Sequence, residues 1–288
     1  MGRGRTEPQA AATGAAMPCV LVNDPADPRL DDYRAVKDGK LWRERGQFVA
    51  EGRLVVRRVI EEWRGNVRSV LLNPAAKRQL DGVLRGVPDV VPIYVCDAEV
   101  LAELTGFAVH RGCLALVKRP PPLALEALLA GHLLVVAEAL SDADNVGGVF
   151  RNAAAFGADA VVLSPTCCDP LYRKAIRTSM AMTLRVPFAR AEPWPEALDV
   201  LAANGFTIVA LTPREPACAL EQFAATPPQR IALVVGTEGE GLSDEALARA
   251  HVRVRIPIAA DVDSLNVAVA TGVALSRLSR LTPPRDLR

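Results

Sequence analysis

Short, uninterrupted apolar runs alternate with helix-length segments along the second half of this chain. Runs of strand length occur at 132–138, 160–163, 207–211, 231–235 and 252–256. Continuous Val, Leu and Ile runs are typical of strands that are buried on both faces of a parallel sheet. The pattern predicts an α/β domain with a parallel sheet and a last helix from Ser264 to about Leu281.

A shorter series of strand-length and helix-length segments precedes this domain. Apolar residues at helical spacing across 47–64 predict a helix; strands are predicted at 67–72, 91–96 and 113–117, and helices at 75–84 and 98–104. The run Arg119-Pro-Pro-Pro122 favours extended backbone and marks a boundary. We therefore expect a disordered tail (1–22), a small α/β domain (23–119), a proline linker (120–122) and a larger domain (123–288).

Composition narrows the class of protein. The chain has 288 residues, half of them hydrophobic, which is enough for a sizeable core. No apolar run approaches the roughly 20 residues that a membrane span needs. The first 18 residues are rich in Ala, Gly and Arg and lack a continuous apolar core, so they indicate a tail rather than a signal peptide.

The charge distribution and the cysteines say less about the class of protein. Residues 1–120 hold 19 Lys and Arg against 15 Asp and Glu, a mild basic bias that is compatible with nucleic acid. The six cysteines and three histidines show no metal-ligand spacing, so we expect neither a disulfide framework nor a metal site. A reducing cytoplasm is the expected location. Cys96 and Cys113 are predicted to be buried in strands, and the pair Cys167-Cys168 suggests no role.

Three polar turns follow predicted strands, at 142–147, 236–241 and 264–266. Ligands of parallel sheets bind beyond the carboxyl ends of the strands, so the three turns indicate one site. Ser264 is expected to cap the last helix. The apolar character of that helix gives no reason for Asn266.

Simpler interpretations exist for each turn. The glycine loop 236–241 has neither the order of a dinucleotide-binding fingerprint nor that of a P-loop, and Glu238 can be a solvated residue in a flexible turn. Asp142, Asp144 and Asn145 are all plausible helix caps. Arg151 can be an ordinary surface arginine. The basic segment 172–180, with one aromatic, can contact phosphate.

The order of the segments is more specific than any one of them. It reads N-x-G-x-x-x-R from Asn145, R-x-S-M from Arg177, G-x-E-G-x-G-L-S from Gly236 and I-P-x6-S-L-N-V-x2-A from Ile256. This order resembles the SpoU/TrmH branch of the SPOUT RNA methyltransferases from about Leu133 to Leu281. Residues 47–52 and 112–117 resemble, more loosely, the small α/β substrate-binding domain of many members.

The resemblance implies a fold and an activity. Members transfer a methyl group from S-adenosylmethionine to a ribose 2′-hydroxyl of RNA, in an α/β parallel-sheet domain with a deep trefoil knot. Carried over by position, the cofactor-binding residues are Thr212, Gly236, Ile256 and Leu265. The catalytic cleft is lined by Asn145, Arg151, Glu238, Ser264 and Asn266. Arg173, Lys174, Arg177 and Ser179 are the expected RNA-binding residues.

The resemblance also implies roles and partners. Arg151 would orient phosphate or hydroxyl beside the developing oxyanion, and Asn266 would hold the ribose. A homodimer through the catalytic domain is expected, with no metal and no membrane. The separate N-terminal domain favours rRNA over tRNA as substrate. A tRNA methyltransferase, a base-nitrogen methyltransferase, a resistance methylase and a catalytically retired RNA-binding or ribosome assembly factor are the alternatives. Ala143 and Ala181 replace residues usual in the family, and neither change removes a functional group.

Overall fold

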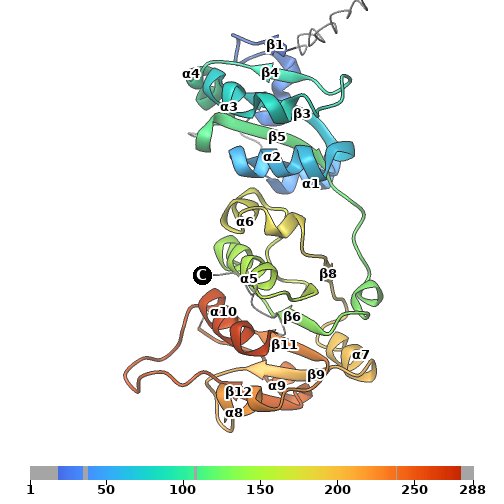
Figure 1. The fold of residues 1–288 in the computed structure, drawn as a ribbon, viewed down its shortest axis with the longest axis vertical. Helices are drawn as coiled ribbons and strands as arrows, with labels where there is room; N and C mark the ends of the chain where they lie inside the picture. Colours follow the sequence, from blue (N-terminus) through green and yellow to red (C-terminus); the bar gives the residue numbers. More distant parts are fainter. Residues whose placement is uncertain (1–18, 35–37, 107–108, 238, 280–288) are drawn as a thin grey trace, which may run out of the picture.

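The structure is a computed structural model that describes residues 19–34, 38–106, 109–237 and 239–279. It has two sheets, one built from the N-terminal part of the chain and one from the C-terminal part, which follow each other along the long axis of the molecule (Figure 1). The predicted tail falls largely on residues 1–18, which lie outside the described ranges.

The N-terminal sheet has the strand order β1-β4-β3-β5-β2. Its strands are β1 (Cys19–Leu21), β2 (Gln47–Glu51), β3 (Val67–Leu72), β4 (Ile93–Val95) and β5 (Cys113–Lys118). Helices α2 (Arg53–Glu62) and α3 (Pro74–Leu84) cover one face, and α1 (Asp38–Arg45) and α4 (Ala98–Thr105) cover the other.

Two sequence predictions are wrong in this region. Residues 47–51 are not helical but form β2, which pairs antiparallel with β5, because the sheet supplies hydrogen-bond partners that a local pattern does not reveal. Residues 19–21 are not part of a disordered tail but form β1, which pairs parallel with β4.

The C-terminal sheet has the order β10-β12-β9-β11-β6-β7-β8, and every pairing in it is parallel. Its strands are β6 (Leu133–Ala137), β7 (Ala160–Leu163), β8 (Phe188–Arg190), β9 (Thr207–Leu211), β10 (Cys218–Ala219), β11 (Ile231–Val235) and β12 (Val252–Arg255). The predicted α/β fold with a parallel sheet is confirmed. The trefoil knot that the family resemblance implies stays a prediction.

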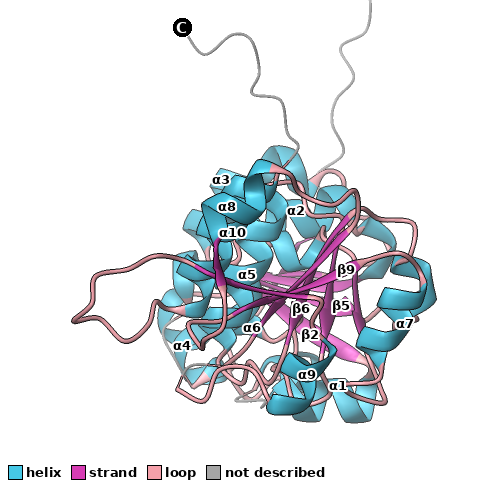
Figure 2. Ribbon diagram, turned by 90° about the horizontal axis from the view of Figure 1, so that it is seen from below, coloured by secondary structure: helices cyan, strands magenta, loops and turns pink. Residues whose placement is uncertain are grey.

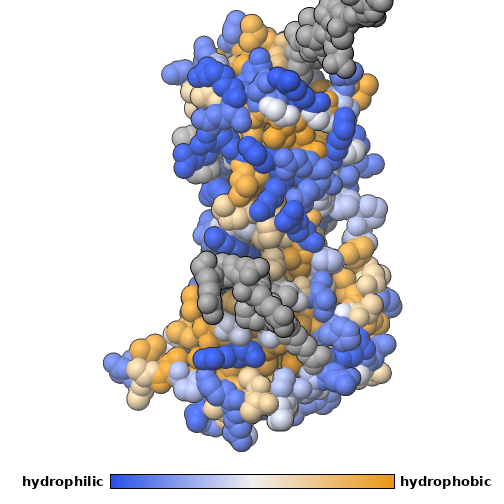
Figure 3. Space-filling model, in the orientation of Figure 1, coloured by the Kyte–Doolittle hydropathy of each residue, from blue (hydrophilic) through white to orange (hydrophobic). Residues whose placement is uncertain are grey.

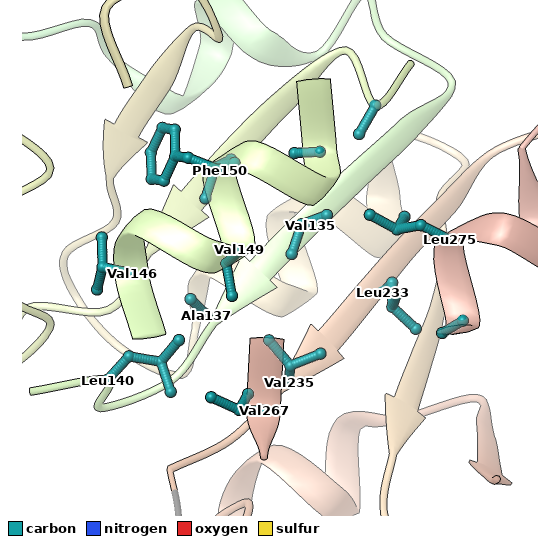
Figure 4. Close-up of a cluster of buried hydrophobic side chains, with 14 of the residues drawn as sticks. Val135, Ala137, Leu140, Val146, Val149, Phe150, Leu233, Val235, Val267 and Leu275 are labelled. Atoms are coloured by element: carbon teal, nitrogen blue, oxygen red, sulfur yellow. The ribbon is translucent and has the colours of Figure 1, made fainter. Parts of the chain in front are cut away.

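Helices cover both faces of this sheet (Figure 2). Successive residues of β6 point to opposite faces, so Val135 packs with α5 (Ala143–Ala155), α8 (Leu220–Ala225) and α10 (Val267–Leu278). Val136 packs with α7 (Ala197–Ala203) and α9 (Asp244–Arg249) on the other face. Figure 4 shows part of the first cluster, in which Val149 of α5 lies beside Ala137 of β6. This core fixes the starts of α5 and α10 beside the strand ends.

The helix starts differ from the sequence prediction at one important place. Asp142 caps α5 and accepts hydrogen bonds from the N–H groups of Asp144 and Asn145. The last helix begins at Val267 rather than at Ser264, and its cap is Asn266. The expected cap role of Ser264 is therefore wrong, and the predicted end at Leu281 lies outside the described residues.

Among the described residues, no helix is both long and apolar enough to cross a membrane. In the same ranges, no group of three or more His, Cys, Asp or Glu side chains is arranged to hold a metal ion.

Candidate active site

A pocket opens at the carboxyl ends of β9, β11 and β12, against the first turn of α10. All four residues expected to bind cofactor lie in its wall. The lining residues are Leu211, Thr212, Pro213, Val235, Gly236, Thr237, Gly239, Gly241, Ile256, Ile258, Ser264, Leu265, Val267 and Ala270. The structure therefore brings the strand end at 211–213, the glycine loop and the segment 256–265 to one place.

The glycine loop doubles back on itself at the pocket. A Cβ at Gly236 would lie 2.5 Å from the carbonyl carbon and oxygen of Gly241, closer than any real contact. Gly239 and Gly241 have φ values of +89° and +74°, a region of backbone conformation that residues other than glycine rarely adopt. This close approach and these φ values explain by backbone geometry why the loop contains glycine at the three positions. Glu238, between Gly236 and Gly239, lies outside the described residues.

The wall of the pocket suits a nucleoside cofactor. Ile256, Leu265 and Val267 contribute apolar surface on which an aromatic ring can lie, and the exposed backbone of the glycine loop contributes polar groups. The Thr212 side chain is buried, and its hydroxyl accepts a hydrogen bond from the N–H of Arg214 at 3.1 Å. These residues fit S-adenosylmethionine, the cofactor that the sequence predicts.

The first and last motifs meet at the mouth of this pocket. Asn266 Nδ2 donates to Asn145 Oδ1 at 2.9 Å. The other side-chain atom of Asn266, Oδ1, accepts from the N–H groups of Ala268 and Val269 at 3.0 and 3.3 Å. Asn266 is thus both a helix cap and one of the contacts between α10 and α5, and it is exposed at the surface.

Close backbone packing holds the two helices at this distance. A Cβ at Gly148 would lie 2.5 Å from the Cβ of Ala268 in the first turn of α10. One turn further along α5, Asn152 Nδ2 donates to the backbone carbonyl oxygen of Ala268 at 2.6 Å. Residues 145, 148 and 152 therefore form the face of α5 that meets α10.

Arg151 and Ser264 have exposed side chains near this contact. Arg151 lies one turn after Gly147 on α5, and among the described residues none forms a hydrogen bond or ion pair with its side chain. Ser264 is exposed and lines the pocket. Both are therefore open to a bound substrate.

The expected RNA-binding residues are differently placed. Arg173 and Arg177, on α6 (Arg173–Thr178), pair with Glu51 of β2 through Nη1 atoms at 2.7 and 3.3 Å from Oε2. Lys174 pairs with Asp144 at 2.8 Å. The side chains of the two arginines stay 26% and 43% exposed, so their outer faces remain accessible.

Ser179 is a correction. Its side chain is fully buried, and its hydroxyl donates to the carbonyl oxygen of Ile176 at 2.9 Å. It stabilises the turn that ends α6, and burial removes it from the expected RNA-binding set.

Sequence reasoning overlooked a buried carboxylate beside the glycine loop. Glu138 follows β6 and is 5% exposed. Its oxygens accept from Ser243 Oγ at 2.6 Å, from the Ser243 N–H at 2.9 Å and from Trp194 Nε1 at 2.8 Å. These bonds fix the end of the glycine loop to the sheet. A charged residue directly after the apolar run 133–137 was the available signal.

Comparison with known proteins agrees with this geometry. The profile of the SpoU rRNA Methylase family matches residues 132–276. An uncharacterized tRNA/rRNA methyltransferase of Mycobacterium bovis is 42% identical over 265 residues, which cover 90% of this chain and 91% of that protein.

Solved structures share the fold. An AdoMet-bound rRNA methyltransferase from Sinorhizobium meliloti aligns with a TM-score of 0.76 over 90% of this chain and 96% of that chain, at 23% identity. A structure described as an RNA 2′-O ribose methyltransferase aligns with a TM-score of 0.71 at 26% identity, over 90% of this chain and 98% of that one.

Proposed function

The chain belongs to the SpoU rRNA methylase family, RNA methyltransferases that use S-adenosylmethionine, and we propose that it methylates a ribose 2′-hydroxyl of ribosomal RNA. The observation that carries the proposal is the hydrogen bond from Asn266 to Asn145 at the mouth of the pocket. It joins side chains 121 positions apart, directly beside the pocket wall.

The proposed cofactor site is the pocket that contains Thr212, Gly236, Ile256 and Leu265. S-Adenosylmethionine supplies a methyl group on a sulfonium sulfur when bound. The task of the chain is then to hold the ribose so that its oxygen approaches in line with that methyl group. Orientation of this kind can supply a large part of the rate enhancement.

Asn145 and Asn266 are proposed to orient the ribose, since an amide can both donate to and accept from a hydroxyl group. Ser264 lies in the pocket wall and would contact the same hydroxyl. Glu238 keeps its expected role in the cleft as a prediction.

Arg151 is proposed to bind the target nucleotide. Its guanidinium group is exposed and, among the described residues, is not engaged in an ion pair. A guanidinium keeps its proton at neutral pH, so its proposed role is to orient a phosphate and stabilise charge on the 2′-oxygen rather than to accept the proton.

The RNA class rests on similarity and on architecture. The matching structure described as an RNA 2′-O ribose methyltransferase supports a ribose hydroxyl as the methyl acceptor. The description of the family supports rRNA as the substrate. The basic side chains of α6 and the N-terminal body, residues 19–119, would extend the contact along the RNA backbone. The Mycobacterium bovis relative carries both tRNA and rRNA in its name, so tRNA is the second candidate substrate.

We also propose a homodimer in the cytoplasm. Ile258, Val262 and Val269 are apolar and 36%, 45% and 53% exposed. Ile258 and Val262 lie in the segment between β12 and α10 that projects from the body, where Figure 3 shows apolar surface. Sedimentation of the wild type and of Val269→Glu tests this: a dimer that the charge dissociates supports the interface, and a monomeric wild type contradicts it.

The activity is tested by transfer of labelled methyl from S-adenosylmethionine to separated rRNA and tRNA from a host that lacks the gene. We expect label in rRNA that survives digestion as a 2′-O-methyl nucleoside. Label in tRNA alone, or on a base, contradicts the proposed substrate.

Binding of sinefungin, an analogue of S-adenosylmethionine, shows whether the chain binds cofactor when neither RNA is labelled. If neither RNA is labelled and sinefungin does not bind, the chain is a retired enzyme that functions as an RNA-binding or assembly protein. The variant Arg151→Ala serves as control, because it should bind sinefungin normally and transfer no label.

A further inference from the structure

Helix α6 carries charged contacts on two adjacent faces. Arg173 and Arg177 are four residues apart and reach the same oxygen of Glu51 in the N-terminal sheet. Lys174 and Thr178, also four residues apart, reach Asp144 at the start of α5, at 2.8 and 2.6 Å. Residues at this spacing share a helix face. Helix α6 therefore connects the N-terminal sheet with α5, and it lies between them in Figure 1.

Glu51 is the buried end of this connection. It is the last residue of β2, and 1% of its surface is exposed. A carboxylate taken out of water is unfavourable unless cationic hydrogen-bond donors surround it. Two guanidinium groups of α6 are among its donors, so the charge of Glu51 favours the docked position of α6.

Apolar packing holds the same segment. Leu171, Ile176 and Leu184 belong to the core cluster of the N-terminal sheet, although they lie far beyond the proline linker. Trp63, directly after α2, also donates through Nε1 to the carbonyl oxygen of Leu184 at 3.1 Å. Residues 171–184 are thus packed into the N-terminal body, and Glu51 fixes their orientation within it.

The second of these faces of α6 leads to the candidate active site. A Cβ at Gly147 would lie 2.8 Å from the carbonyl oxygen of Ala175, so the backbones of α5 and α6 are in close contact. The hydrogen bond from Lys174, followed by that from Thr178, holds the pKa of Asp144 below its usual range. The next residue is Asn145, which meets Asn266.

We propose that Glu51 is a positioning residue for methyl transfer. Through Arg173 and Arg177 it holds α6, and through α6 it holds the first turn of α5 where Asn145 meets Asn266. The inference rests on the proposed function, because it concerns the same site. It assigns to a residue of the N-terminal sheet an effect on catalysis rather than on RNA affinity alone.

The test compares Glu51→Gln with Glu62→Gln. Glutamine keeps the shape and removes the charge. Glu62 also bridges the two bodies, through a two-pronged pair with Arg185 at 2.6–3.0 Å, but that pair is partly exposed and leads to no residue of the site. Glu62→Gln is therefore the matched control.

We expect Glu51→Gln to lower kcat at least tenfold, to leave sinefungin affinity within twofold, and to speed amide hydrogen exchange in residues 143–150. Glu62→Gln should change none of these by more than twofold. The rescue variant Glu51→Asp, which keeps the charge, should recover part of kcat. A kcat of Glu51→Gln within twofold of wild type, or a loss confined to the KM for RNA, would overturn the proposal.

Two controls keep the result readable. If Glu51→Gln does not fold, Asp144→Ala interrupts the same path at an exposed carboxylate, and an unchanged kcat there overturns the proposal. Hydrogen exchange needs no RNA, so it tests the positioning role of Glu51 independently of the proposed function. Absence of transfer by the wild type refutes the proposed function, whereas unchanged exchange in Glu51→Gln refutes the positioning role.

Discussion

Asn266 has two separable roles, and two substitutions distinguish them. Its Oδ1 caps α10 by accepting from two backbone N–H groups, and its Nδ2 donates to Asn145. Asn266→Ala removes both interactions. Asn266→Ser keeps a hydroxyl that can cap the helix, but its side chain is too short to reach Asn145.

The magnitude follows from the contacts. Loss of a helix cap costs about 1 kcal/mol of folding stability. The bond to Asn145 is exposed, so its contribution belongs at the low end of about 0.5–1.5 kcal/mol. Asn266→Ala should therefore lose about 1.5 kcal/mol, a fall in Tm of roughly 3–6 °C for a chain of this size. Asn266→Ser should lose about 0.5 kcal/mol.

Activity should not follow stability. Both variants lack the amide that we propose to orient the ribose, so both should transfer methyl at least tenfold more slowly, which corresponds to about 1.4 kcal/mol in the barrier. Thermal unfolding and transfer of labelled methyl, measured below both melting temperatures, give the two quantities. Sinefungin binding confirms that the pocket remains intact.

Two results would refute this reasoning. Near-normal turnover by Asn266→Ser would reduce Asn266 to a helix cap and would remove the contact with Asn145 from the mechanism. Equal losses of Tm in the two variants would show that the serine does not cap, and that the stability of α10 depends on another contact.

Three further predictions concern packing and protonation. Calorimetry should show a lower Tm and a lower sinefungin affinity for Gly148→Ala, because the new Cβ would lie 2.5 Å from that of Ala268 and α10 must move. The control is Gly82→Ala in α3, whose new Cβ would meet no neighbouring atom within 4 Å, and it should raise the free energy of unfolding by about 1 kcal/mol. Ala181 is buried at a φ of +66°, so Ala181→Gly should stay within about 1 kcal/mol of wild type in denaturant unfolding, while β-branched Ala181→Val should lose several times more. Burial, and then the charge of Asp169, raise the pKa of the Cys168 thiol to about 11, so alkylation followed by mass spectrometry should be slow at neutral pH and rise with pH until near that value; a plateau near pH 8 would contradict it.

Much of the fold could be predicted from local patterns. The strands at 160–163, 207–211 and 231–235 were predicted with the bounds that the structure has, because buried parallel strands are short, mainly apolar runs. The strand at 67–72 was also predicted with its bounds, although Arg68 and Ser69 interrupt its apolar run. The helix predicted across 47–64 is confirmed at 53–62 and wrong at 47–51, because a short apolar segment suits a strand as well as a helix. The two-residue strand β10 was too short to leave a pattern.

The candidate site divides in the same way. The four cofactor residues were placed by the family resemblance, and the structure brings all of them into the wall of one pocket. Thr212, Gly236 and Ile256 each follow a strand directly, and parallel strands end at the same edge of a sheet. The burial of Ser179 and the pairing of Arg173 and Arg177 with Glu51 could not be predicted. They depend on how the N-terminal body sits against α6.

The sequence by itself determined the α/β class, the order of the motifs and the glycines of the loop, because these follow from short-range periodicity and backbone geometry. Only the tertiary structure decided that Asn266 meets Asn145 and that Glu51 reaches α6. Each of these contacts joins residues more than 110 positions apart by a hydrogen bond or ion pair. Such short-range interactions form only after the core has brought the segments together, so no local pattern in the chain encodes them.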